Sequence, residues 1–308
     1  MPLNFAFSLE WIPLLTAFGG TAVAAWWDLK TTEVPDEVFY VMFGVGAVYY
    51  LYQSFLAASL WPLISAAAVS GILFAIGYVM YKFGQWGGAD TFLLAGVGFL
   101  LPAVPTQLGL GLNLAPQLFF PFPFSYLVNV FLIGTPYMLV YAAVIAARNR
   151  KVRYEFHKQM KASAKSYMFF SVILFAFFLG LSYYLSKGIF LQASQPSIFT
   201  LIKNSFIPAA ATLGLFIIFK FSKSVEDFGF KKKIPVSGLK VGDVLLESKE
   251  FVGMTPRQVA AVKRSGRKFV VIKEGVRFAP AFPLALLFTL LYGDAIFLIL
   301  KYFISLPL

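Results

Sequence analysis

Cysteine is absent from this sequence of 308 residues, and histidine occurs only once, as His157. A chain without cysteine has no structural disulfide, no zinc site built from thiolates and no cysteine nucleophile. The single histidine lies in a basic segment, so a Ser-His arrangement or a histidine-ligated metal has almost no material to use. We therefore expect neither a metal nor a cofactor.

Charged residues are also scarce, at 13% of the chain, whereas 59% of the residues are hydrophobic. The mean hydropathy is +0.76, and a soluble domain could not bury so many hydrophobic residues. A transmembrane helix needs about 20 mostly apolar residues. About eight stretches meet this need: Trp11–Trp27, Val38–Ala58, Trp61–Lys82, Thr91–Gly111, Phe124–Ala147, Ser166–Leu185, Ile198–Lys220 and Phe278–Leu300. The sequence predicts an all-α polytopic membrane protein with about eight transmembrane helices.

Acidic residues are outnumbered by basic ones, 14 to 26, which gives a formal net charge of +12. Such a charge would suit a nucleic-acid-binding protein, but its distribution follows the predicted membrane topology. If the N-terminus lies outside, seven Lys/Arg fall in the inner segment 148–165 and fourteen in 220–277. This is the positive-inside pattern. It predicts a multi-pass protein of the cell membrane, with both termini outside and no nucleic-acid partner.

The basic segment Arg148–Lys165 has two interpretations that the sequence leaves open. It either contacts the anionic heads of membrane lipids or serves only to fix the topology.

One sizeable soluble segment, residues 221–277, separates the last two predicted helices. Short strands with turns at Gly238 and Gly242 are expected first, then a helix from Thr255-Pro256 through Val262, and then a strand from Phe269. We predict a transmembrane catalytic domain (1–220), a cytoplasmic α/β insertion (221–277) and a final transmembrane helix (278–308). The insertion is too small for a large core of its own, so it should lean on the membrane domain or the lipid surface.

Two aspartates stand at the ends of apolar runs. Asp28 closes the run Trp11–Trp27, and Asp90 opens the run Thr91–Leu101 after the glycine-rich turn 84–89. A carboxylate at the edge of the hydrocarbon layer is costly, and such residues are usually functional. The predicted topology brings both aspartates to the cytoplasmic face.

A third acid, Asp294, lies deeper in the last predicted helix. At a rise of about 1.5 Å per residue it is about 24 Å from the inner surface, beyond the reach of the other two aspartates. Lys203 falls at a comparable depth in the preceding predicted helix. Asp294 either pairs with Lys203 or reaches water independently.

Two neighbouring carboxyl groups suffice for aspartyl proteolysis. One takes a proton from water while the other, protonated, hydrogen-bonds the scissile carbonyl, and the two titrate as a coupled pair. The alternative is that the aspartates only cap helix ends. Asp90 fits an N-cap, whereas Asp28 sits at a helix C-terminus, where the macrodipole disfavours negative charge.

The surroundings of both aspartates carry a family resemblance. The segments Asp-Leu-Lys-Thr-Thr-Glu-Val-Pro-Asp (28–36) and Gly-Gly-Ala-Asp (87–90) resemble the two signatures of the GxGD-type prepilin peptidases. The resemblance is strongest to the archaeal preflagellin and prepilin peptidases. It implies an aspartic endopeptidase with Asp28 and Asp90 as its catalytic residues.

The implied substrates are archaellin (preflagellin) and type IV prepilin-like precursors, whose short basic leader precedes a hydrophobic helix and is removed at the cytoplasmic face. The four-cysteine zinc segment of many bacterial members is missing, so N-methylation of the product is not expected. Presenilin-type proteases also share the Gly-x-Gly-Asp motif but use a Pro-Ala-Leu element. Pro280-Ala281-Phe282 is close to it in composition, and nothing in the sequence ties it to the aspartates.

An acidic cluster follows Asp28 in the only inner loop that is net negative. Glu33, Asp36 and Glu37 would attract a basic leader to the site. Alternatively, Asp36 and Glu37 begin a helix whose dipole favours them.

Four further residues are assigned to the site by their positions. Gly87 and Gly88 would let the chain before Asp90 approach the substrate backbone, unless they form a plain turn. Pro35 would fix the chain's exit from the first helix. Lys30 either stays near Asp28 and stabilises its charged form or snorkels to water as a topology residue.

Two other classes of function compete with the peptidase. A proton- or cation-coupled transporter could use Asp28 and Asp90 as ion sites, although the sequence has no inverted repeat and no acid at the membrane midplane. A structural protein of a pilus assembly platform would tolerate loss of both aspartates.

Overall fold

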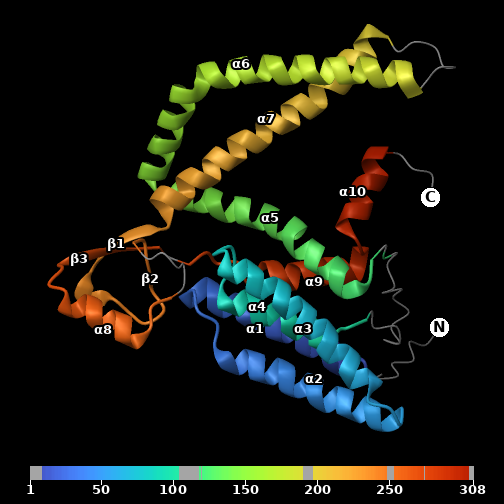
Figure 1. The fold of residues 1–308 in the computed structure, drawn as a ribbon, viewed down its shortest axis with the longest axis vertical. Coiled ribbons are helices and arrows are strands. Elements are labelled where there is room, and N and C mark those ends of the chain that lie inside the picture. The colour runs from blue at the N-terminus through green and yellow to red at the C-terminus, as the bar shows by residue number, and fades with distance from the viewer. Residues whose placement is uncertain are drawn as a thin grey trace. The chain divides into compact units, whose positions relative to one another are not determined.

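The computed structural model describes residues 9–103, 118, 120–189, 197–247, 253–273 and 275–304. Helices dominate these residues, and a small three-stranded sheet accompanies them (Figure 1). The chain divides into two compact units. The first joins Met1–Val140 to Lys233–Leu308, and the second is Tyr141–Lys232.

The first unit begins with four helices close to the predicted stretches: α1 (Trp11–Thr31), α2 (Asp36–Leu56), α3 (Trp61–Lys82) and α4 (Gly88–Leu100). It also holds the start of α5 (Phe122–Arg148) and, near the C-terminus, α9 (Ala281–Tyr292) and α10 (Ala295–Ile304). Among the described residues of the whole chain, five helices are long and apolar enough to cross a membrane: α2, α3, α5, α6 and α7. The protein is therefore mostly helical, as expected of a polytopic membrane protein, and the number of eight spans stays a prediction.

Two helix ends next to the aspartates differ from the prediction. Helix α1 continues past Asp28 to Thr31, because Thr32 turns into the left-handed region (φ 63°) and its N–H bonds the Asp28 carbonyl 2.9 Å away. Helix α4 begins at Gly88 rather than Thr91, so Asp90 lies in its first turn. The predicted continuation of this helix beyond residue 103 lies outside the described residues.

The single helix predicted over Phe278–Leu300 is wrong, because the chain breaks at Gly293 (φ 77°) into α9 and α10. The break is stabilised by Asn129 of α5, which is fully buried. The Asn129 amide donates to the Gly293 carbonyl (2.8 Å) and to Thr289 Oγ1 (2.8 Å), and its oxygen accepts from the Ala295 N–H (3.0 Å). Backbone groups freed by the break are therefore satisfied inside the protein.

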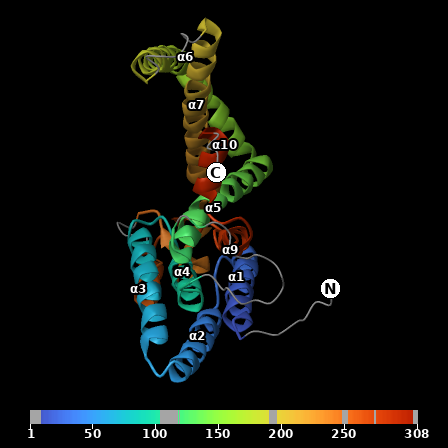
Figure 2. The ribbon, with the colours of Figure 1, turned by 90° about the vertical axis from the view of Figure 1, so that its right-hand side faces the viewer.

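Helix α4 lies at the centre of the first unit. Figures 1 and 2 both place it alongside α1 and α3, and within the stretch from Asp90 to Leu100 only Phe92 is exposed. Gly98 allows α3 to approach, since a Cβ atom there would lie 2.5 Å from the Leu73 side chain. The aspartate that begins α4 is therefore carried by the most deeply packed helix of the unit.

The predicted insertion folds as a small α/β element. Strands β1 (Lys231–Pro235), β2 (Val244–Leu245) and β3 (Phe269–Lys273) form a sheet in the order β1-β3-β2, with β2 antiparallel to β3. A short 3-10 turn, η1 (Val236–Gly238), follows β1, and α8 (Pro256–Arg264) starts at the Thr255 N-cap. These positions agree with the sequence prediction.

The insertion has a core of its own and also reaches the helical bundle. Its buried residues are Val236, Leu239, Met254, Val259 and Val270. Gly242 (φ 93°) lies beside the loop after α1, because a Cβ atom there would be 3.9 Å from Glu33 Oε1. The insertion therefore lies beside the loop that follows Asp28, and whether it leans on the helices or on the lipid surface stays a prediction.

The second unit is a hairpin of two long helices, α6 (Arg150–Ile189) and α7 (Ile198–Gly229), together with the end of α5. The two helices lie side by side (Figure 1). The predicted span Ser166–Leu185 is the C-terminal half of α6, and most of the basic segment 148–165 forms its helical N-terminal half. Arg153 supports the junction with α5 by donating to the Ala146 and Ala147 carbonyls.

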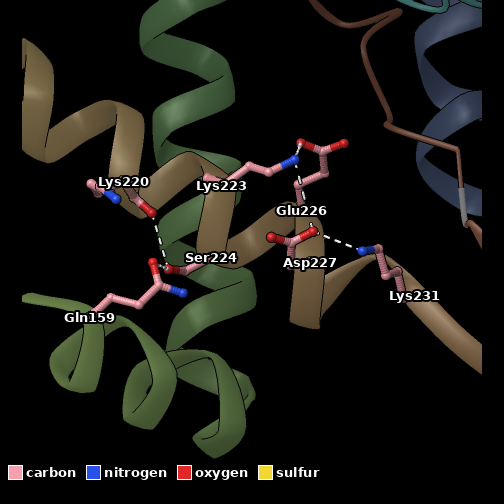
Figure 3. A network of polar contacts seen from close by, with 7 residues as sticks. All are labelled: Gln159, Lys220, Lys223, Ser224, Glu226, Asp227 and Lys231. Atoms are coloured by element: carbon pink, nitrogen blue, oxygen red, sulfur yellow. Dashed lines mark hydrogen bonds and ion pairs between the residues drawn. The ribbon is translucent and has the colours of Figure 1, made fainter. Parts of the chain in front are cut away.

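Polar contacts connect the basic end of this hairpin (Figure 3). Ser224 of α7 donates to the Lys220 carbonyl (3.0 Å) and to Gln159 of α6 (3.5 Å). Asp227 pairs with Lys231 at 2.7 Å and with Lys223 at 3.8 Å. Partly exposed ion pairs of this kind contribute little stability each, so the packed helix faces hold the hairpin together.

Candidate active site

Asp28 is buried in the last turn of α1, with 7% of its surface exposed. Its Oδ2 accepts a hydrogen bond of 2.9 Å from the Ala279 N–H, which lies just before α9. A backbone N–H fixes the direction of a carboxylate and replaces part of its lost hydration. The start of α9 therefore holds Asp28 in place.

Asp90 is equally buried, in the first turn of α4. The preceding turn begins at Gly84 (φ 67°), whose N–H bonds the Tyr81 carbonyl while the Gln85 N–H bonds that of Met80. This is a Schellman ending of α3, and its left-handed residue favours glycine. The turn leads to Gly87, whose N–H donates to Asp90 Oδ2 at 2.9 Å.

The structure brings the two predicted aspartates into one site. Their carboxyl groups interact electrostatically, and α1 packs against α4. Each carboxyl uses Oδ2 for its backbone hydrogen bond, and neither Oδ1 bonds to another described residue. Within the described residues, one oxygen of each aspartate is therefore left without a hydrogen bond.

The Asp90 contact also bears on the capping alternative. Asp90 is the third helical residue and bonds back to the N–H of Gly87 at the N-cap, as in half of a capping box. Asp90 therefore does support the helix start, although not as the predicted N-cap. Asp28 has no such role, because its side chain bonds to a distant segment.

Arg277 is the charged neighbour that sequence reasoning missed. Its positive charge acts on the Asp28 carboxyl, and its buried Nε has no hydrogen-bond partner among the described residues. The Tyr137 hydroxyl of α5 donates to the Arg277 carbonyl at 2.8 Å. Lys30, the predicted neighbour, is exposed and lies over the Trp27 ring, 6.0 Å from its centroid. In the sequence, Arg277 looked like one more topology residue before an apolar run.

The segment 277–282 contacts Asp28, which the sequence did not predict. Nothing in the sequence ties Pro280-Ala281-Phe282 to the aspartates, but Ala279, directly before this tripeptide, donates the hydrogen bond to Asp28. The contact joins residues 251 positions apart. Only the packing of α9 against α1 reveals it.

The predicted substrate-binding residues border the aspartates in the chain. Glu33, Asp36 and Glu37 are all exposed, and Pro35 is the N-cap of α2. Asp36 and Glu37 stand in the first turn of α2, where the helix dipole also favours them. Both interpretations of the acidic cluster therefore remain.

The two glycines before Asp90 adopt ordinary backbone conformations with negative φ, so the folded chain does not need glycine there for its torsion angles. A Cβ atom at Gly88 would meet nothing within 4 Å. Gly88 therefore faces open space, whereas a Cβ atom at Gly87 would lie 3.4 Å from Asp90 Oδ2.

Asp294 belongs elsewhere in the first unit. It is buried, with 3% exposed, and accepts a hydrogen bond of 3.3 Å from the Phe120 N–H. The length of α9, about 18 Å at 1.5 Å per residue, separates it from the Ala279 end of that helix. Its pairing with Lys203, which belongs to the other compact unit, stays a prediction.

Metal-ligand groups of three or more His, Cys, Asp or Glu residues do not occur in the described part of the chain. The two aspartates with their backbone donors and one arginine are suited to acid-base chemistry on water and a carbonyl group.

Known proteins similar to this chain are named as peptidases. The chain is 25% identical over 146 residues to the prepilin peptidase EppA of Methanothermobacter thermautotrophicus, covering 46% of this chain and 38% of that protein. It is 31% identical over 143 residues to the preflagellin peptidase of Methanocaldococcus jannaschii (44% and 59%) and 34% identical over 84 residues to that of Methanococcus voltae (27% and 36%). The alignments thus span about a third to three fifths of these relatives. The type IV leader peptidase family matches residues 15–185, more than half of the chain and a range that includes both aspartates. The chain therefore belongs to the type IV leader peptidase family.

Proposed function

We propose that the protein is a membrane aspartic endopeptidase that removes the basic leader from prepilin-like or preflagellin precursors at the cytoplasmic face. The observation that carries the proposal is the pair of buried carboxyl groups, Asp28 and Asp90, each held by one backbone N–H. The archaeal relatives named as prepilin and preflagellin peptidases support the choice of substrate.

In the proposed reaction the two aspartates share one proton. The charged carboxylate takes a proton from a water molecule as its oxygen bonds to the scissile carbonyl carbon, while the protonated aspartate hydrogen-bonds the carbonyl oxygen. The tetrahedral intermediate then breaks its C–N bond, and the leaving nitrogen takes the proton that the first carboxylate removed from water, which restores that carboxylate. No metal is needed, because the two carboxyl groups supply both base and acid.

The decisive experiment measures cleavage of a tagged precursor with a basic leader by membranes containing wild type, Asp28→Asn or Asp90→Asn. We expect cleavage by the wild type and a loss of at least about 10³-fold in each variant, because removing one member of an acting pair removes most of the catalysis. Absence of cleavage by the wild-type protein on every precursor offered would refute the proposal.

A matched control is Asp294→Asn, which changes another buried acid of the same unit. The asparagine oxygen can still accept the Phe120 N–H, so we expect normal cleavage. Loss of activity at unchanged yield and unfolding temperature would show that Asp294 takes part in the reaction.

The same assay tests the acidic cluster. Reversing Glu33 and Glu37 to lysine should raise KM for a basic leader at low salt and leave KM for a neutral leader unchanged, because the attraction is electrostatic. An unchanged KM for both leaders would leave Asp36 and Glu37 as residues that only begin α2.

A further inference from the structure

Trp86 is an unusual tryptophan for a membrane protein. The chain has five tryptophans, all within the described residues, and Trp86 is the only one of them that is buried, with 8% exposed. Tryptophan in membrane proteins usually lies at the lipid–water interface, where its N–H meets water. Trp86 instead points into the core cluster that also contains residues of α4 and α9.

Its ring contacts aromatic residues of two other segments. The Trp86 centroid lies 5.2 Å from the Phe131 ring of α5, nearly parallel to it at 22°. It lies 5.9 Å from the ring of Phe278, just before α9, and 5.8 Å from the ring of Phe282 in α9. The contact with Phe282 is edge-on, at 65°. Phe278 and Phe282 also contact each other edge-on. Aromatic pairs in these geometries stabilise the packing beyond the area that they bury.

The positions of two of these rings along the chain are informative. A peptide unit is planar, so the N–H of each residue is fixed to the carbonyl of the residue before it. The N–H that binds Asp90 belongs to the peptide between Trp86 and Gly87, and the N–H that binds Asp28 belongs to the peptide between Phe278 and Ala279. Both donor peptides therefore begin at an aromatic residue of the same cluster.

Helix α5 supports this arrangement from the other side. A Cβ atom at Gly134 would lie 2.9 Å from the Phe278 ring and 3.2 Å from Ala281 Cβ, so glycine lets the segment pack against α5. The Tyr137 hydroxyl holds the Arg277 carbonyl, one residue before Phe278. The Phe278–Ala279 peptide is thus fixed by packing and by a hydrogen bond.

We propose that the contact between Trp86 and Phe278 is a positioning device that sets the distance between the Asp28 and Asp90 carboxyl groups. The expected effect on kcat rests on the proposed peptidase function. The expected effect on the distance between the aspartates does not. Trp86 and Phe278 are positioning residues, because they act through the backbone donors that follow them in the chain. Loss of the Trp86 ring would leave each aspartate bonded to its own donor while the two donors moved relative to each other.

The geometric test measures a distance between two spin labels. Because the chain has no cysteine, labels attach only to cysteines that are introduced. Spin labels attached at Leu29→Cys and Phe92→Cys, both exposed positions near the two aspartates, report their separation without substrate. We expect one narrow distance distribution in the otherwise unchanged protein and a shifted or broadened one after Trp86→Ala. Trp86→Phe keeps a ring in the cluster and should restore the narrow distribution.

The matched control is Phe99→Ala at the far end of α4. Phe99 is as buried as Trp86, and its ring contacts Phe43 and Tyr50, outside the proposed device. Phe99→Ala should lower the unfolding temperature but leave the distance distribution unchanged. An unchanged distribution in Trp86→Ala, or an equal change in Phe99→Ala, would overturn the proposal.

The kinetic test compares the same variants per folded molecule. Trp86→Ala should lower kcat by about tenfold or more with little change in KM, since small displacements of catalytic groups have effects of this size. Trp86→Phe should recover most of kcat, and Phe99→Ala should keep it. Wild-type kcat in Trp86→Ala would count against the positioning role. If the wild-type protein cleaves no precursor but Trp86→Ala still shifts the distance distribution, the peptidase function is refuted. The positioning role of Trp86 then stands.

Discussion

Arg277 shows how much a single residue near Asp28 depends on its surroundings. Its guanidinium acts on the Asp28 carboxyl, and its buried Nε has no described hydrogen-bond partner. A buried donor without a partner lowers the stability of the fold by about 1–3 kcal/mol. A residue with this cost is expected to contribute to function. We infer that its positive charge stabilises a carboxylate on Asp28 during the reaction.

Replacing this guanidinium should therefore lower activity without unfolding the protein. We expect Arg277→Gln to lower kcat by about tenfold, the effect of losing about 1.4 kcal/mol of charge interaction in the transition state. The unfolding temperature should stay the same or fall slightly, because the substitution removes the cation whose charge acts on the buried Asp28 carboxyl. Lys30→Gln, which removes the exposed cation near Asp28 in the chain, is the control and should keep kcat. Equal effects of both substitutions would contradict the assignment to Arg277.

Gly84 lies in the turn after α3 and Gly88 is the first residue of α4, and the two should respond differently to alanine. Gly84 needs the left-handed conformation, so Gly84→Ala should destabilise the fold by about 1 kcal/mol. Gly88 has ordinary torsion angles and open space beside it, so Gly88→Ala should leave the unfolding temperature unchanged. If the substrate backbone passes there, Gly88→Ala raises KM. Measurements of unfolding and KM decide this, and an unchanged KM would remove Gly88 from the substrate-binding surface.

At the scale of elements, the sequence predicted most helices because their apolar runs are long and end at polar residues. The same periodicity could not locate the break at Gly293, since the residues on both sides are apolar and the partner, Asn129, lies on another helix. The insertion was predictable from local signals, such as the Thr255 cap and the turn glycine Gly242.

In the candidate site, too, some residues could be predicted from local sequence and others only from the packing of distant segments. Asp28 and Asp90 were predictable because a carboxylate next to an apolar run is rare and costly. Ala279 and Trp86 were not, because their roles depend on α9 and α5 packing against segments far away in the sequence.

Asn129 joins three elements, and its substitution should show how much the break between α9 and α10 depends on it. Asn129→Leu keeps the branched shape of the side chain but leaves the Gly293 carbonyl and the Ala295 N–H unsatisfied in an apolar interior. Each such group costs about 1–3 kcal/mol, so we expect a clearly lower unfolding temperature in detergent. Thr135→Val on the same helix removes an exposed hydroxyl that bonds only within its own helix and should be nearly neutral. Similar unfolding temperatures for both variants would show that the Asn129 bonds contribute little.

At the scale of the whole molecule, the remaining prediction is the orientation in the membrane. The fourteen Lys/Arg of residues 220–277 should keep the insertion in the cytoplasm, and α1 and α2 then place residues 57–60, between α2 and α3, outside. The chain has no cysteine, so a single introduced thiol can be labelled without background. Ser237→Cys in the insertion and Ser59→Cys between α2 and α3 are exposed and nearly isosteric substitutions. In intact cells an impermeant thiol reagent should label Ser59→Cys alone, and both should react after the membrane is opened. Labelling of Ser237→Cys in intact cells would invert the topology and place Asp28 and Asp90 at the outer face, where a leader that stays in the cytoplasm could not reach them.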